Sequence, residues 1–598
     1  MPLARWLPRF AALLAHPRLP WLAALLGVLL ASPALGTGLW LDDHLHRFVV
    51  GMHVRGEGLG PWWDLYVAAE GDQALTRARM DVGFSPWWTV PELRVRFLRP
   101  LPAATHYLDY AAWPGAAWWM HAQSLAWYGG LVVAVGTLLR RWLGATWIAG
   151  LATLLYAIDD AHATPVAWIA QRNALIAAVL VVLMLIAHDR WSRDGWRPGA
   201  WLAPLLLLLA LLAGEGSIAA LGLLGAQVWL LPLRLDRKEP WSVRVTRALR
   251  SLRPFVAVVV VWRLVYDALG YGAAGSGVYL DPLREPAAFL AVLPDRMAAL
   301  LLAQVSGPSA ERWSTDPMPW EAARWGALAV VALGGLVLGP RLRCDRGLLV
   351  ALAGAGMALV PAATTVPADR MLLLVGVGGS AAVAAVVAVA MEPGARSSRR
   401  WLAVGLGLPL LGMHGVWSPI ALPARVVALP RALEQQPRAV VASLPDDPEL
   451  AEQELVIANA PPTFVSSTLW LMRWNGPEPL PRRLRQLGAA WEPVVVHRPD
   501  AHTLVLQPVG GYFGDPWSAI ARGRAHPFAV GDRVELAGMT VEILGVAKGL
   551  PTVVRVRFEV PLEDPSLRWV TWQGERFVPW APPEVGQTVA LSSSPPRS

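Results

Sequence analysis

The sequence contains little charge, two lysines and a single cysteine. Only 16% of its 598 residues are charged, against about 25% in an ordinary soluble domain, so the composition excludes an ordinary soluble protein. The one cysteine, Cys344, excludes an intramolecular disulfide and any metal site built from several cysteines. No tandem repeat is visible, and the composition also excludes a disordered, collagen-like or coiled-coil chain.

Apolar residues make up 55% of the chain, and they gather in long blocks that give a mean hydropathy of +0.41. A helix needs about 20 such residues to cross a bilayer. We therefore predict an α-helical polytopic membrane protein with about eleven transmembrane helices. These spans lie near residues 20–40, 117–138, 143–158, 172–188, 199–214, 216–233, 254–270, 322–339, 347–363, 371–391 and 401–420.

The placement of arginine predicts the orientation of the spans. With the N-terminus in the cytoplasm, the short loops on that side collect most of the arginines, such as those between Arg234 and Arg253, as the positive-inside rule requires. Because this explains the basic balance, no nucleic-acid partner is expected. Together with a composition typical of a GC-rich bacterial genome, the pattern predicts a multi-pass protein of the bacterial inner membrane, with residues 20–40 kept as the first helix rather than cleaved as a signal peptide.

Two long loops are expected on the outer side, at residues 41–116 and 271–321. The second contains an apolar stretch at residues 286–305, which predicts an amphipathic helix that would cover a donor site. An odd number of spans also places the C-terminal part of the chain outside, in the periplasm.

From residue 422 onward, apolar runs become short and alternate with polar residues. We divide the chain into a transmembrane domain at residues 1–421 and a periplasmic β-rich domain at residues 422–598 that begins with a short α/β part. The end of the chain, at residues 592–598, is expected to fray. Strands are predicted at 439–444, 454–458, 494–497, 503–507, 533–537, 540–546 and 552–558.

Ionisable residues at membrane depth or at the ends of spans are costly, so they are functional candidates. Here they gather on the outer side rather than at the centres of the spans, which favours chemistry on a membrane-anchored substrate over transport. Each also has a structural interpretation, as a helix cap, a loop acid or an arginine that reaches to the interface. The candidates are Asp42, Asp43, Arg99, Asp159, Asp160, His162, Arg172, Glu215 and Arg370.

Several of these residues stand in motifs that follow a recognisable order. The motifs are Asp42-Asp43, Phe97-Leu98-Arg99-Pro100-Leu101, Leu108-Asp109-Tyr110-x-x-Trp113 with His121, and the stretch from Ala161-His162 to Arg172-Asn173. The set resembles the C-type (GT-C) membrane glycosyltransferases, in particular the bacterial relatives of the transmembrane O-mannosyltransferases that carry tetratricopeptide repeats. The resemblance covers residues 20–390; it does not cover the C-terminal domain, and the tetratricopeptide repeats are absent.

The resemblance implies a GT-C fold and the transfer of a sugar, with inversion, from a polyprenyl-phosphate donor to an acceptor outside the cytoplasm. An acid in the first outer loop acts as the general base in such enzymes. That position matches Asp42 or Asp43, and we favour Asp43. Arg99 and Arg172 match motif arginines that would hold the donor phosphate, and the position of Arg370 adds a third.

Two positions depart from the family pattern. Glu215 matches the acid of a Lys-Glu turn in which Gly214 replaces the lysine, and Thr164 stands where the family often has a glutamate. Asp159 or Asp160 is the candidate to substitute in space for that missing acid, with His162 as a further residue of the active site.

Other functions stay open at this point. A transporter or flippase of lipid-linked glycans would place polar residues through the centres of the spans, whereas several spans are nearly devoid of them. A non-catalytic envelope protein would bind its partner, a glycan, lipid or protein, through the β-rich domain. His44 and His46 form a His-x-His pair beside Asp43, but no further ligand is evident nearby, so the sequence indicates no metal site and leaves any cofactor unknown.

Overall fold

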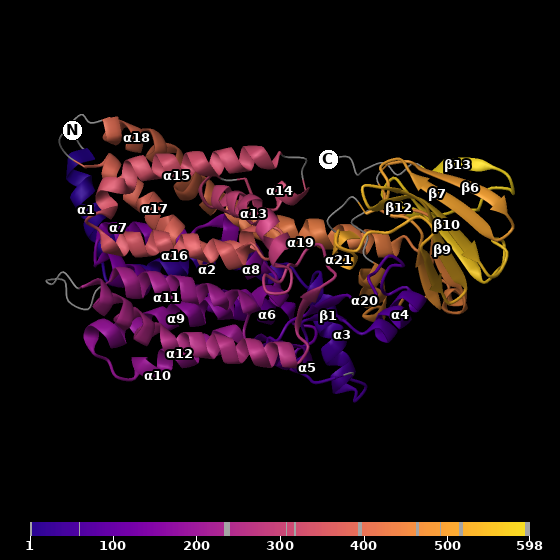
Figure 1. The fold of residues 1–598 in the computed structure, drawn as a ribbon, viewed down its shortest axis with the longest axis horizontal. Coiled ribbons are helices and arrows are strands. Elements are labelled where there is room, and N and C mark those ends of the chain that lie inside the picture. Colours follow the sequence, from indigo (N-terminus) through magenta and orange to yellow (C-terminus); the bar gives the residue numbers. More distant parts are fainter. Residues whose placement is uncertain are drawn as a thin grey trace.

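The computed structural model describes residues 3–58, 60–231, 240–306, 308–315, 319–392, 398–461, 466–490, 492–513 and 518–591. A bundle of helices forms the N-terminal two-thirds of the chain, and two β-sheets lie beyond one end of it (Figure 1). The predicted fold class, a helical bundle followed by a β-rich part, is confirmed.

Six helical segments of the described residues are long and apolar enough to cross a membrane. They are Leu19–Gly36, Ala117–Leu143, Ile169–Asp194, Pro286–Val305, Trp320–Leu342 and Ser398–Ala442. Shorter apolar helices lie at five of the other predicted spans: Trp147–Ala157, Gly199–Leu211, Glu215–Leu230, Arg346–Ala362 and Val375–Ala390. The predicted span 254–270 is the second half of α12 (Trp241–Ala268), whose first half carries four arginines.

The segment predicted as an amphipathic loop helix at 286–305 is the helix α13 (Pro286–Ser306). It is long enough to span, yet the chain enters and leaves it at the same end of the bundle. Before α13, the Leu280 amide donates to the Thr364 carbonyl at 2.8 Å; after it, the Ala310 amide donates to Asp369 at 2.7 Å. Because both acceptors lie between α16 (Arg346–Ala362) and α17 (Val375–Ala390), α13 stays on one side of the bundle.

The helices approach one another closely because glycines face the neighbouring backbones. A Cβ on Gly150 would lie 1.9 Å from the Leu14 carbonyl oxygen, and one on Gly347 would lie 1.9 Å from that of Trp142. These contacts join α7 (Trp147–Ala157) to α1 (Leu3–Ala15), and α16 to α6 (Ala117–Leu143). Small residues of this kind allow helices to pack tightly where lipid supplies no hydrophobic driving force.

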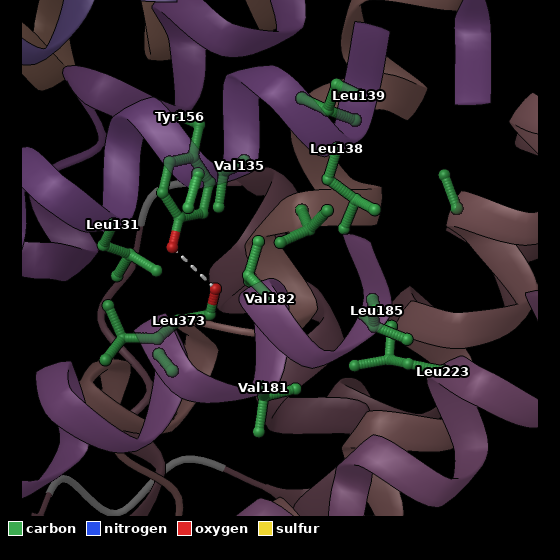
Figure 2. Packing of buried hydrophobic residues seen from close by; sticks show 14 of the residues in the cluster. Leu131, Val135, Leu138, Leu139, Tyr156, Val181, Val182, Leu185, Leu223 and Leu373 are labelled. Atoms are coloured by element: carbon green, nitrogen blue, oxygen red, sulfur yellow. Dashed lines mark hydrogen bonds between the residues drawn. The ribbon is translucent and has the colours of Figure 1, made fainter. Parts of the chain in front are cut away.

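Leucine and valine fill the centre of the bundle. Figure 2 shows part of this core, where Leu131 and Val135 of α6 lie near Val182 of α9 (Arg172–Asp194). Tyr156 is fully buried there, and its hydroxyl donates to the Leu373 carbonyl at 2.9 Å. The bond satisfies a carbonyl just before α17 and so fixes the connection that carries Arg370.

A small antiparallel sheet joins the two long loops at residues 41–116 and 271–321. Its order is β1 (Val67–Glu70), β2 (Arg94–Arg96) and β3 (Gly272–Ala274). The first two strands belong to the loop 41–116 and the third to the loop 271–321, so residues about 180 positions apart lie side by side. The pairing holds both loops over the same end of the bundle.

The last helical segment continues much further than predicted. After α18 (Ser398–Leu411) and a π-helical turn, α19 runs from Ser418 to Ala442, so the predicted domain boundary at 421/422 lies inside a continuous helical segment. The predicted strand at 439–444 is wrong, because Val440, Val441 and Leu444 are buried as the end of this segment packs against the C-terminal core. A short apolar run fits a buried helix end as well as a strand.

Two sheets make up the C-terminal part. A four-stranded sheet has the order β12-β11-β4-β5, with β4 (Glu454–Ile457) parallel to β5 (Arg483–Gln486) through the helix α20 (Ser466–Trp474); this is the expected short α/β part. The six-stranded sheet is antiparallel and has the order β13-β6-β7-β10-β9-β8. Its strands β6 (Val494–Asp500), β7 (Thr503–Pro508), β8 (Arg533–Leu536), β9 (Met539–Ala547) and β10 (Leu550–Phe558) confirm predicted ones.

Four strands of the C-terminal part were not predicted: β5, β11 (Leu567–Gln573), β12 (Arg576–Pro579) and β13 (Thr588–Leu591). The three short strands β1, β2 and β3 were not predicted either. β5 and β12 have only four residues each and carry arginines, so the alternation that marks a strand is too short to see. The predicted frayed end, 592–598, lies outside the described residues.

Candidate functional site

A cavity of about 370 Å³ lies at the end of the bundle that is covered by the two loops at residues 41–116 and 271–321. Its walls come from helix α3 (Asp42–Val54), the first outer loop, the start of α9, the turn after α10 (Gly199–Leu211) and the connection between α16 and α17. Four of the nine candidate residues line it: Asp42, Arg99, Glu215 and Arg370. They come from four separate parts of the sequence.

Arg99 and Glu215 form an ion pair in the cavity wall. Arg99 donates from Nε and Nη2 to Glu215 Oε2 at 3.0 and 2.8 Å, and its guanidinium lies over the rings of Phe97 and Tyr66 at 4.5 and 4.9 Å. Burial lowers the pKa of Arg99, but the neighbouring Glu215 carboxylate outweighs it and raises the pKa above its usual value. Glu215 Oε1 is buried without a hydrogen-bond partner among the described residues, so this oxygen is available to a ligand.

Arg370 lies in the cavity without a carboxylate partner in the part of the chain that the structure describes. Its guanidinium lies 5.6 Å from the ring centroid of Trp168, and its Nε is buried without a hydrogen-bond partner. Arg370 as a whole is half-buried, and a partly buried guanidinium without a carboxylate partner is suited to binding an anion.

Asp42 is the first residue of α3 and its exposed surface faces the cavity. The surrounding protein removes water from the carboxylate and raises its pKa above the usual value, while the positive charges of Arg370 and then Arg99 oppose this rise. The residue before it, Leu41, has a φ of 50°. At this left-handed residue the chain changes direction, so that α3, which begins at Asp42, does not continue along the axis of the first predicted span.

Asp43, the residue that we favoured as the base, points elsewhere. It is fully buried, and its two carboxylate oxygens accept hydrogen bonds from the backbone amides of Trp40 at 3.1 Å and Ala170 at 2.7 Å. Burial raises its pKa well above the usual value, although both hydrogen bonds work against this shift. Asp43 therefore ties the start of α3 to the turn before α9, and it is Asp42 that faces the cavity.

Arg172 does not reach the cavity either. It is fully buried at the start of α9 and pairs with Asp109 of α5 (Pro100–Ala112) at 2.6 Å. Its other hydrogen bonds go to the Met120 carbonyl at 2.7 Å and to the side chains of Thr105, Ser124 and Gln123. With all of its nitrogens engaged, Arg172 holds the first outer loop onto the bundle.

The remaining candidates also serve the framework. Asp159 caps the next turn through the Ala161 amide at 3.0 Å, and the His162 Nδ1 lies 3.3 Å from the Tyr128 hydroxyl. Asp160 accepts from Ser418 and from Arg425 of α19, each at 2.7 Å. None of these three lines the cavity. Neither Asp159 nor Asp160 therefore supplies to the cavity a carboxylate in place of the glutamate that the family often has at the position of Thr164.

Sequence reasoning missed several residues of the cavity wall. His46 lies one turn after Asp42 on α3, a spacing of four residues that places both on one face of a helix, and this spacing is visible in the sequence. Tyr66 and Thr365 also line the cavity, but each comes from a loop without a pattern of its own. Asn173, which closes the motif that ends in Arg172-Asn173, lines it as well.

The structure offers no metal site in the described residues, where no group of three or more His, Cys, Asp or Glu side chains is arranged to hold an ion. The His-x-His pair is split. His44 Nε2 lies 3.0 Å from Glu434 of α19, while His46 packs against Tyr66 at a ring distance of 4.7 Å on the side of the cavity.

No family model and no curated protein matches the chain. Among solved structures, it is similar to the oligosaccharyltransferase from Archaeoglobus fulgidus tethered with an acceptor peptide, at 12% identity and a TM-score of 0.42. The apo form gives 11% and 0.43, and the complex with an inhibitory peptide and a dolichol-phosphate gives 12% and 0.40. The alignments cover 76–79% of this chain but only 64% of the length of the archaeal one. Identities this low transfer no function to the chain.

Proposed function

We propose that the chain transfers a sugar, with inversion, from a polyprenyl-phosphate donor to an acceptor on the periplasmic side of a bacterial inner membrane. The observation that carries the proposal is the cavity, where a carboxylate, Asp42, faces two guanidinium groups, Arg99 and Arg370. The motifs that resemble the C-type membrane glycosyltransferases support the same reaction class.

The donor phosphate fits the arginine side of the cavity. Arg370 has no carboxylate partner among the described residues, and a planar guanidinium binds phosphate through two parallel hydrogen bonds. Beside it, Ala358, Pro361 and Leu374 line the cavity with apolar surface from the ends of α16 and α17. A polyprenyl chain would leave along this wall toward the lipid, while its phosphate stays between Arg370 and Arg99.

Asp42 supplies the base. The acceptor hydroxyl oxygen attacks the anomeric carbon from the side opposite the phosphate, so that the configuration inverts. As the new carbon–oxygen bond forms, the bond from the carbon to the phosphate oxygen breaks and its electron pair stays on the lipid phosphate. The hydroxyl proton passes to Asp42, whose raised pKa makes the carboxylate a stronger base.

Glu215 holds Arg99 in the position that the phosphate needs. The pair is half open to the cavity, with side chains 17% and 21% exposed, so an incoming phosphate would share the guanidinium with Glu215. The free Oε1 of Glu215 would then accept a hydrogen bond from a hydroxyl of the donor sugar.

The C-terminal part helps to close the cavity in this proposal. Ile520, in the short helix α21 (Ser518–Ala521), lines it, and the backbone around this residue pairs with both outer loops. The Val90 amide donates to the Ala521 carbonyl at 3.0 Å, and the Gly277 amide donates to the Ala519 carbonyl at 2.8 Å. These bonds support a role for residues 518–523 in covering the site.

The test is the substitution Asp42→Asn in the full-length chain, with membranes supplied with radiolabelled polyprenyl-phosphate sugars. Transfer should fall by about 10²–10⁴-fold, the usual contribution of a general base, while the protein folds normally. Asp446→Asn, which neutralises an exposed carboxylate of the C-terminal part, is the matched control and should keep full activity.

Two outcomes would reject the assignment. Undiminished transfer in Asp42→Asn would exclude Asp42 as the base. Movement of the lipid-linked sugar across proteoliposomes without a new glycosidic bond would identify the protein as a flippase.

A further inference from the structure

A second hollow lies on the outer side, on the opposite face of α3 from the Asp42 cavity. Its volume is about 570 Å³, within the range of small-molecule sites. The first wall is α3, which contributes Arg47, Gly51 and Arg55; these residues recur every four positions and so share one face of the helix. The other walls are Tyr110 at the end of α5, Pro114, and Trp474 and Asn475 at the end of α20.

The hollow is positively charged. Two arginines line it, and the lining contains no acidic residue. Arg55 is exposed and pairs with Glu57 at 3.1 Å, outside the lining. Arg47 makes neither a hydrogen bond nor an ion pair with any residue that the structure describes, although it is half-buried. An unpaired guanidinium on a concave surface selects an anion.

A neutral polar group also lies in this wall. The ring of Tyr110 lines the hollow, but its hydroxyl is buried on the side of Asp43 and Arg172 and does not open to it. The Asn475 side chain donates only to the Leu471 carbonyl, at 2.7 Å, and this leaves its amide oxygen as an acceptor.

Trp474 adds a fixed aromatic surface. Its ring packs edge-on against Phe48 at 4.5 Å and lies 4.6 Å from the Arg55 guanidinium. Gly51 makes room for it, since a Cβ there would lie 3.2 Å from the ring. Helix α20 lies beside α3 (Figure 1). The tryptophan comes from the C-terminal part and the arginines come from the loop 41–116, so the hollow is formed by both parts.

We propose that this hollow binds an acidic saccharide, a sugar chain that carries carboxylates. The arginines would bind the carboxylate, the Asn475 amide oxygen would accept a hydrogen bond from a ring hydroxyl, and the apolar C–H face of a sugar would pack on Trp474. An acidic peptide would use the arginines, but it would not present a hydroxyl to Asn475 and a C–H face to Trp474 together. The inference does not depend on the transferase proposal, because binding requires neither the donor nor Asp42.

The experiment is isothermal titration of the full-length protein in detergent with tetragalacturonate, without any donor. Binding is expected, and Arg47→Gln should weaken it at least tenfold, as a charge-assisted hydrogen bond predicts. Asn475→Leu, which removes the amide oxygen, should weaken it by about fivefold. Arg77→Gln, at an exposed arginine of α4 (Gln73–Val82) outside the lining, should bind as the unmodified protein does.

Three outcomes would overturn the inference. The first is no binding of tetragalacturonate, and the second is binding that Arg47→Gln leaves unchanged. The third concerns specificity: equal binding of hexaglutamate would identify the hollow as a peptide site, and equal binding of maltotetraose would remove the role of the charge.

Discussion

The buried pair of Arg172 and Asp109 gives the sharpest test of how the site is built. Both side chains are completely buried and lie 2.6 Å apart. Replacing Arg172 with methionine removes the charge but keeps most of the length. Asp109 is then left in the interior with only Gln123 as a hydrogen-bond donor from a side chain.

The expected cost follows from this burial. Breaking a buried ion pair on one side typically destabilises a protein by about 3–5 kcal/mol, because the remaining charge cannot reach water. Arg99 provides the matched control, since it too pairs with an acid near the first outer loop. Its pair with Glu215 is 17% and 21% exposed and opens to the cavity, so water can reach the remaining carboxylate and Arg99→Met should cost less than Arg172→Met.

The assay is the free energy of unfolding in mixed micelles, measured by titration with SDS. A double variant, Arg172→Met with Asp109→Leu, separates charge from shape. Two apolar residues of similar volume should recover most of the loss, since they need no hydrogen bonds. The reasoning is refuted if Arg172→Met is no less stable than Arg99→Met, or if the double variant is as unstable as the single one.

Three further predictions concern the cavity and the bundle. Arg370→Gln removes the charge that most lowers the pKa of Asp42, so the acid limb of the pH–rate profile should move to higher pH. An unchanged acid limb would show that Arg370 does not influence the pKa of the base. Burial lowers the pKa of His46 from 6.5 to about 3, so the unfolded state takes up the proton first and the free energy of unfolding falls as pH drops below about 6.5. His46→Asn should therefore make this loss of stability less steep between about pH 6.5 and 4. An equally steep loss in both proteins would assign the pH dependence to other groups. Gly347→Val places a side chain against the Trp142 carbonyl and should lower the yield of folded protein in size-exclusion chromatography, whereas Gly356→Val, which meets open space, should not.

The sequence predicted the helical elements well because hydropathy is a local property. A run of about 20 apolar residues can satisfy its backbone polar groups in lipid only as a helix, so composition alone placed segments such as 117–138 and 322–339. The α13 segment was also predicted correctly as a helix. Its length alone would fit a span. Only the contacts of the residues before and after the helix show that the chain enters and leaves it at the same end of the bundle.

The strands were harder to predict. Long alternating strands such as β9 and β10 were found, whereas the buried β5 and β11, which flank β4, were not. β11 is buried at five of its seven positions and so lacks the alternation that marks a half-exposed strand, and β5 has only four residues, two of which are arginine. The predicted strand at 439–444 failed for the related reason that three buried apolar residues suit a helix end equally well.

For the site, the sequence alone determined which residues are unusual: acids and arginines at the outer ends of apolar spans, where charge is costly in any fold. It did not decide what each one meets. Asp42 and Asp43 are neighbours of the same type, yet one faces the cavity and the other holds two backbone amides, because successive residues of a helix point about 100° apart. Arg99 and Arg172 likewise stand in motifs of equal weight, but one opens to the cavity and the other is enclosed with Asp109. Only the tertiary structure assigns these partners, since the groups that surround each charge come from segments far apart in the chain.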